Sequence, residues 1–245
     1  MDLTDRTAAA ESIIAAEERE RSPVWKAVEL AVDLFPTPVR AALGAFGGLQ
    51  VRRLQNLEYL HQALRDDLRD LAGRIDKLDE AHRRFCEQHL IGLVVDAHFK
   101  VEALRSKTKI KRIARILVST WNEDPCVSPD YAEEMMRVAA ALDDADVQVL
   151  GQIVAAQKRY LGREGCPDLN AANEAWKSSP PTIKGMTTAG VTSICLKLES
   201  FGLITRVEGI PTMFGLETAG LPFGLLSKGS DFVRFALREG EGGVV

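Results

Sequence analysis

The sequence predicts a mainly α-helical protein: an N-terminal helical bundle with one long heptad helix, followed by a C-terminal winged-helix-like module of helices and strands. Three observations support this fold class. No proline lies between Val39 and Asp124, so that span can be helical almost throughout. Apolar residues recur there every seven positions. Near the C-terminus a helical pattern is followed by strand, loop and strand patterns, which is how a winged helix ends.

Proline positions and charge divide the chain into segments. Pro125 and Pro129 flank the stretch "PCVSP", which marks a boundary between two folded regions. We expect a flexible acidic tail over residues 1–22, a helical, coiled-coil domain over 23–126, a winged-helix-like domain over 127–239 and a disordered tail over 240–245.

The heptad pattern lies in the proline-free span. Leucines recur every seven residues from Leu57, and a second series starting at Leu54 fills the alternate positions, with charged residues between them. One continuous helix over residues 50–85 would be roughly 50 Å long. Such a helix can pair with its own copy in a homodimer or pack on a neighbour in its own bundle. The self-association seam that we predict consists of Leu57, Leu64, Leu68, Leu71, Ile75 and Leu78.

A dense basic run follows this region, in the stretch "RSKTKIKRIAR". Residues 50–126 contain fifteen Lys/Arg and twelve Asp/Glu, so positive charge is segregated to the helical half. The run could bind a phosphate backbone or an anionic membrane, but a solvated helix face is the favoured interpretation. Its six members are Arg105, Lys107, Lys109, Lys111, Arg112 and Arg115.

The C-terminal module is predicted as a helix over 188–201, strands over 203–207 and 223–226, and a closing helix over 230–238. Thr187 or Thr188 is expected to cap the first helix and Gly202 to end it. In a DNA-reading winged helix this first helix would enter the major groove. The charge pattern argues against that use, because residues 127–245 hold eleven Lys/Arg and fifteen Asp/Glu. The basic candidates near the helix are Lys184 and Lys197.

Neither metal nor catalytic signatures stand out. His82, Cys86 and His89 share one helix face, but a single helix cannot surround a metal ion, and we favour polar seam residues over a metal site. The four cysteines form no CxxC pair, which is typical of reduced structural thiols. Phosphate-binding, dinucleotide-binding, hydrolase, metalloprotease and deaminase motifs do not occur. We therefore expect a non-enzymatic protein without a cofactor.

Composition and the chain ends suggest a cytoplasmic protein. Hydrophobic residues make up 46% and charged residues 27% of the chain, with a net charge of −4, as in ordinary globular proteins. The acidic N-terminal stretch lacks the apolar run of a signal peptide. The longest uncharged stretches, such as residues 41–51, are about half of what a membrane helix needs. A membrane is therefore not a favoured partner.

The order of several stretches resembles the Abi-alpha family of bacterial proteins, grouped by sequence with abortive-infection (anti-phage) functions. The stretches are "RRLQNLEYLHQAL", "EEMMRVAAALDDADVQVLGQI", "LESFGLI" and "FGLLSKGSDFVRF". The resemblance implies a bacterial cytosolic protein in host defence and supplies no catalytic residues. The matching positions are Leu198, Phe201, Gly202, Leu203, Ile204, Leu226, Ser227, Gly229 and Phe232, with serine where the family has threonine.

Three functional hypotheses follow from these observations. The first is a non-enzymatic interaction protein that self-associates through the heptad seam and senses another protein. The second is a DNA-binding regulator that uses residues 105–115 together with the winged helix. The third is a membrane-perturbing abortive-infection effector that uses the small-residue segment 39–50.

Overall fold

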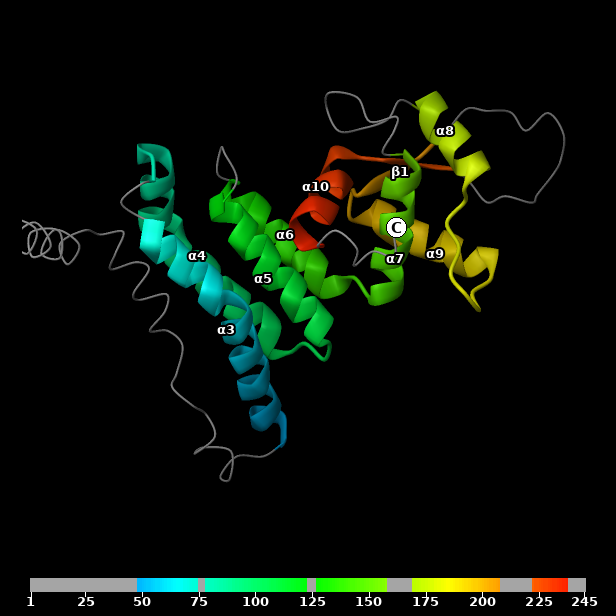
Figure 1. The fold of residues 1–245 in the computed structure, drawn as a ribbon. Helices are drawn as coiled ribbons and strands as arrows, with labels where there is room; N and C mark the ends of the chain where they lie inside the picture. Colours follow the sequence, from blue (N-terminus) through cyan, green and yellow to red (C-terminus); the bar gives the residue numbers. More distant parts are fainter. Residues whose placement is uncertain (1–47, 75–77, 123–126, 158–168, 208–221, 238–245) are drawn as a thin grey trace, which may run out of the picture. The chain divides into compact units, whose positions relative to one another are not determined.

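The computed structural model describes residues 48–74, 78–122, 127–157, 169–207 and 222–237 (Figure 1). Over these residues the chain forms eight helices and one two-stranded sheet, which confirms a mainly helical protein. Both predicted tails, 1–22 and 240–245, lie outside the described residues.

The chain divides into two compact units, Met1–Ala140 and Ala141–Val245. This division falls one helix after the boundary that the prolines suggest at residues 126–127. The predicted domain limits therefore stay predictions, and each unit is described by itself.

Three helices that pack pairwise against one another dominate the first unit: α3 (Gly48–Arg74), α4 (Glu80–Glu102) and α5 (Lys107–Asn122). Four leucines of α3 have no exposed surface, and three of them belong to the predicted seam, so this part of the seam is covered within a single chain. Each such burial stabilises the fold by about 1.5–3 kcal/mol. These residues are Leu60, Leu64, Leu68 and Leu71.

The single helix expected over residues 50–85 does not form. Helix α3 ends at Arg74, and Asp79 has an extended backbone with a ψ of 169°. The Asp79 carboxylate accepts the backbone N–H of His82 at 2.9 Å and thereby starts a new helix, α4. Of the predicted seam, Leu57 and Leu78 are half-buried, and Ile75 lies outside the described residues.

Helix α6 (Pro129–Ala141) also belongs to the first unit, apart from its last residue. Its Glu133 carboxylate lies 3.7 Å from the Lys100 ammonium of α4. The Lys109 ammonium of α5 donates a hydrogen bond to the carbonyl of Ala140 at 3.0 Å. Helix α6 is thus tied to both α4 and α5.

The second unit centres on α7 (Asp144–Gln157), which contacts α8 (Leu169–Ser178), α9 (Thr188–Ser200) and α10 (Ser227–Ala236). Strands β1 (Ile204–Arg206) and β2 (Phe223–Leu225) pair antiparallel, with Ile204 opposite Leu225. The connection between the strands, residues 208–221, lies outside the described residues. The strands are one or two residues shorter than predicted, and the closing helix begins three residues earlier.

The ends of α9 follow the local sequence signals. The Thr187 hydroxyl accepts the N–H of Gly190 at 3.3 Å, which caps the N-terminus. At the other end Gly202 takes a positive φ of 68°. Its N–H and that of Leu203 donate to the last carbonyls of α9, which is a Schellman motif. The chain therefore leaves α9 and enters β1 within a few residues.

Two close contacts fix β2 and α10 to the rest of the unit. The buried Gln157 amide donates to the carbonyl of Phe223 at 2.8 Å and accepts the N–H of Leu225 at 2.9 Å, so it occupies a free edge of β2. Gly229 in the first turn of α10 lies against the backbone of Leu203, and a Cβ there would collide with the Leu203 carbonyl oxygen. Only glycine fits this approach.

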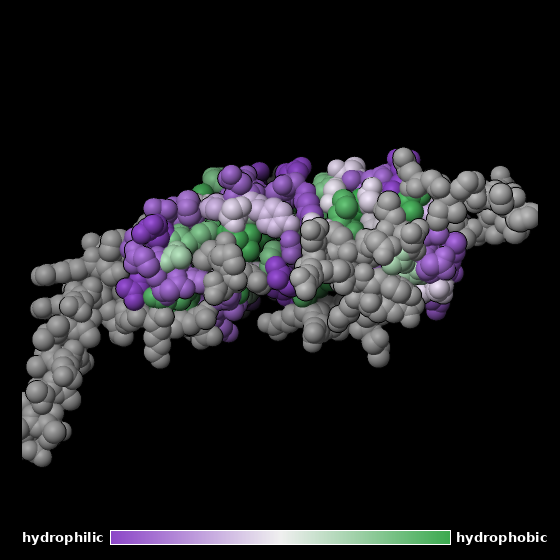
Figure 2. All heavy atoms as spheres, turned by 90° about the horizontal axis from the view of Figure 1, so that it is seen from above, coloured by the Kyte–Doolittle hydropathy of each residue, from purple (hydrophilic) through white to green (hydrophobic). Residues whose placement is uncertain are grey.

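Large apolar side chains are scarce on the described surface. Figure 2 shows hydrophilic side chains over much of the coloured area on the displayed face, with smaller apolar areas between them. Among the described residues the exposed large apolar side chains are Phe99, Met186 and Leu196.

Candidate interaction surfaces

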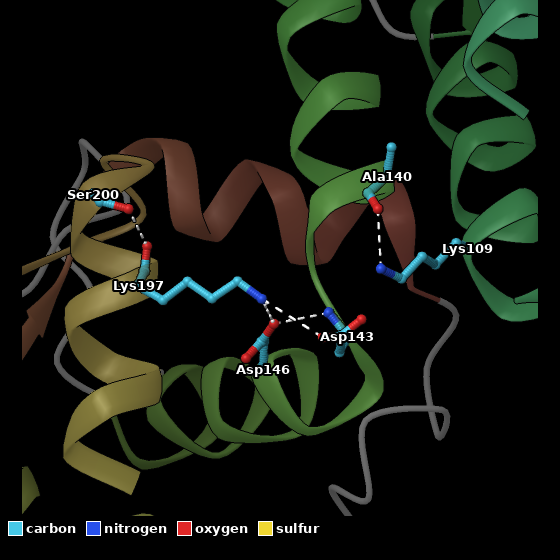
Figure 3. Close-up of polar contacts among 6 residues, drawn as sticks. All are labelled: Lys109, Ala140, Asp143, Asp146, Lys197 and Ser200. Carbon is cyan, nitrogen blue, oxygen red and sulfur yellow. Dashed lines mark hydrogen bonds and ion pairs between the residues drawn. The ribbon is translucent and has the colours of Figure 1, made fainter. Parts of the chain in front are cut away.

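The cations on and after α9 are neutralised within the second unit. The Lys197 ammonium lies 2.5 Å from Asp146 Oδ2 and 3.7 Å from Asp143 Oδ2 (Figure 3). At the end of β1, the Arg206 guanidinium donates to Glu199 at 2.9 Å. These cations are therefore already occupied by carboxylates.

Asp146 holds a central position in this arrangement, and its pairing with Lys197 was not predicted from the sequence. Its side chain is only 6% exposed. Besides pairing with Lys197, its Oδ2 accepts the backbone N–H of Asp143 at 2.7 Å, which caps the start of α7 (Figure 3). One carboxylate of α7 thus both caps its own helix and binds a cation of α9.

The outward face of α9 carries no charge. Four exposed residues at spacings of four, three and four form one stripe along the helix. Met186 joins this stripe, because its Cγ lies only 2.7 Å from where a Cβ on Gly190 would be. We call this surface the α9 face, and its members are Met186, Ala189, Ser193, Leu196 and Ser200.

The basic run of residues 105–115 is exposed over only part of its length. Helical geometry turns half of it inward: Arg112 is 4% exposed, Arg115 is half-buried and Lys109 is used on Ala140. The exposed members are Arg105, Lys107 and Lys111, and the ammonium of Lys107 lies 5.3 Å from the centre of the Tyr59 ring.

Lys184, the remaining predicted anion-binding residue, is exposed in the turn before α9. It belongs to the second unit, whereas the basic run belongs to the first.

Two of the four histidines contact each other between helices α3 and α4. The rings of His61 on α3 and His98 on α4 stack with centroids 5.5 Å apart. Burial, together with the neighbouring His98 and Arg65, lowers the pKa of His61 to about 3, and burial also lowers the pKa of His98. Within the described residues no group of three potential ligands could hold a metal ion.

Of the cysteines, Cys86 and Cys195 are buried, and burial raises the pKa of the Cys195 thiol to about 12. A thiol with so high a pKa stays protonated at neutral pH and is a poor nucleophile. Cys126 and Cys166 lie outside the described residues.

A search of the described helices for one long and apolar enough to cross a membrane found none. The small-residue segment 39–50, on which the membrane hypothesis depends, falls almost wholly outside the described residues.

Comparisons of the chain with protein-family models, with curated proteins and with solved structures found no significant match.

Proposed function

We propose that the chain is a non-enzymatic interaction protein in which a helical bundle precedes a winged-helix-like module that binds another protein. The order α9, β1, β2 and the packing of α9 on α7 support the winged-helix interpretation. The pairwise packing of α3, α4 and α5 supports the bundle.

The uncharged α9 face carries this proposal. A helix that reads base edges presents Arg, Lys, Asn or Gln outward. Here the outward residues are small, hydroxylic or apolar, and the nearby cation Lys197 is bound by Asp146. Depletion of charge is typical of the core of a protein interface. The module is therefore better suited to a protein than to the DNA major groove.

The partner that we propose is a different protein bound transiently. A helix of 13 residues is about 20 Å long and about 10 Å wide, so its face offers roughly 200 Å². Stable interfaces bury about 800 Å² on each side. The α9 face alone is too small for a permanent homodimer, which favours a weaker and reversible contact.

Self-association through the heptad seam is a separate proposal. Leu64, Leu68 and Leu71 are fully buried in one chain, so a dimer built on them would require α3 to leave α4 and α5. Light scattering tests it directly: a monomer mass across a tenfold range of concentration would refute self-association.

The proposed setting is bacterial defence against phage, which rests on the resemblance to the Abi-alpha family. The two motif segments lie together, since the N–H of Leu226 donates to the carbonyl of Leu203 at 3.0 Å and Gly229 packs on the same carbonyl. This proximity gives the motif residues a structural role, in keeping with a non-catalytic protein.

Site-specific photo-crosslinking tests the α9 face. A photoreactive phenylalanine analogue replaces Ser193 in one variant and Ser179, an exposed serine elsewhere in the same unit, in the control. In cells that naturally make the protein, with and without phage challenge, we expect a protein adduct from position 193 that Leu196→Glu abolishes. Equal adducts from both positions, or crosslinking of position 193 to DNA, would overturn the proposal.

A further inference from the structure

A positively charged surface lies in the first unit, assembled from two helices about 50 residues apart in sequence. All five of its cations are exposed. Two come from the first turns of α3, one precedes α5 and two lie on α5 itself. We call it the α3–α5 basic surface, and its members are Arg52, Arg53, Arg105, Lys107 and Lys111.

Asn56 holds the two parts of this surface together. Its side-chain amide donates to the carbonyls of Val101 at 3.0 Å and Leu104 at 2.7 Å, which joins α3 to the turn before α5. Arg52 lies one helical turn before Asn56 and on nearly the same face of α3. The α3 arginines therefore lie beside the turn that contains Arg105.

Tyr59 makes the second connection. It lies one turn after Asn56 on α3, and the Lys107 ammonium lies 5.3 Å from the centre of its ring. Lys111 follows Lys107 by one turn on the same face of α5. The five cations thus form one surface over the start of α3, the turn before α5 and the start of α5.

The positive charge of this surface is not balanced locally. Within the described part of the chain, none of the five cations forms an ion pair with a carboxylate. The acids nearest in sequence, Glu58 and Glu102, are both half-buried. Elsewhere in the same unit Lys100 is paired with Asp96 at 2.6 Å. The surface therefore carries net positive charge that a polyanion would neutralise.

The surroundings of the cations favour nucleic acid over a membrane. A membrane-binding surface places large apolar side chains beside its cations so that they insert between lipids. Among the larger neighbouring side chains whose exposure is described, the exposed ones are polar, Gln55 and Thr108. The exposed Phe99 is two positions from Val101, which puts it on the side of α4 away from α3.

We infer that the α3–α5 basic surface binds the phosphodiester backbone of a nucleic acid without reading its sequence. Lys and Arg side chains that contact phosphates fix position on the strand and carry no base information. This site is separate from the α9 face, so either proposal can fail while the other stands.

Fluorescence anisotropy of the full chain with a labelled 20-base-pair duplex of arbitrary sequence tests the inference. If each cation neutralises one phosphate, the slope of log K against log [NaCl] is about −4.5, and affinity falls about 500-fold between 50 and 200 mM salt. The variant Lys107→Gln/Lys111→Gln should reduce the slope to about −2.7 and the loss to about 40-fold. Lys177→Gln/Arg234→Gln is the matched control, because it removes two exposed cations of the second unit that pair with acids.

Three results would overturn the inference. The first is no salt-dependent binding of the duplex at 50 mM NaCl. The second is a control variant that weakens binding as much as the test variant does. The third is preferential, variant-sensitive binding to vesicles of phosphatidylserine and phosphatidylcholine, which would assign the surface to a membrane. Circular dichroism of every variant checks that the helices are retained.

Discussion

Lowering the pH from 7 to 5 should destabilise the first unit through His61. This histidine is 7% exposed and stacks on His98 between α3 and α4. Burial holds the pKa of His61 at about 3 in the folded chain, against an ordinary value of 6.5. Between these two values the unfolded chain binds a proton that the folded chain rejects. Stability is therefore complete above about pH 6.5 and is lost as the pH falls below it.

The magnitude follows from this difference. At pH 5 the histidine of the unfolded chain is almost fully protonated, because the pH lies about 1.5 units below its pKa. Keeping His61 neutral in the folded chain therefore costs about 2 kcal/mol of folding free energy. This value hardly depends on the folded pKa as long as that pKa lies below about 4. The lowered pKa of His98 acts in the same direction.

Urea unfolding can be followed by Trp121, which is buried in α5, in a background where Trp25 and Trp176 are phenylalanine. The variant His61→Leu lacks the titrating ring. Between pH 7 and pH 5 its free energy of unfolding should therefore fall by about 2 kcal/mol less than that of the parent. Subtracting the two series cancels the carboxylates that also titrate in this range. Equal losses in both proteins would refute the reasoning.

Three further predictions concern single positions. Gly229→Ala should lower the free energy of unfolding by about 1–3 kcal/mol, because the new Cβ collides with the Leu203 carbonyl. Gly92→Ala should raise the free energy of unfolding by about 0.5–1 kcal/mol, because its Cβ meets no atom within 4 Å. Urea unfolding midpoints measure both changes. Gln157→Met should lower the free energy of unfolding by about 2–4 kcal/mol, since it leaves the Phe223 carbonyl and the Leu225 N–H without a partner. Hydrogen exchange should then show that the Leu225 amide has lost its protection. Thr108→Glu should stabilise α5 by about 0.3–1 kcal/mol in thermal melts yet weaken duplex binding, and tighter binding would contradict the assigned surface.

The sequence predicted best what depends on neighbouring residues. The cap at Thr187 and the positive φ of Gly202 are local requirements of a helix end, and the sequence predicted Thr187 or Thr188 as the cap and Gly202 as the end of the helix. The buried face of α3 was also foreseeable, because leucines seven apart share one face whatever they pack against. The break at Asp79 was missed, although an acid followed by a helical stretch is itself a cap signal, because the heptad spacing continues across it.

What the sequence could not predict are contacts between distant residues. Lys197 was a candidate for anion binding until the fold placed it on Asp146, 51 positions away. Arg52 and Arg53 were not selected, because only the bonds of Asn56 to the α4–α5 turn bring them beside Arg105. Long-range pairing, rather than local composition, therefore decides which charges remain available to a ligand.

The cations of α9 and of α5 differ in their surroundings, and this contrast separates the proposed roles of the two surfaces. In the second unit a buried carboxylate neutralises Lys197 and leaves an uncharged helix face. In the first unit the opening turn of α5 contains no acid, and Lys107 and Lys111 lie one turn apart. Like charges at this spacing cost about 0.2–0.5 kcal/mol, and cations at a helix start cost about 0.3–1 kcal/mol. A polyanion would relieve both costs, so binding there should also raise the stability of α5.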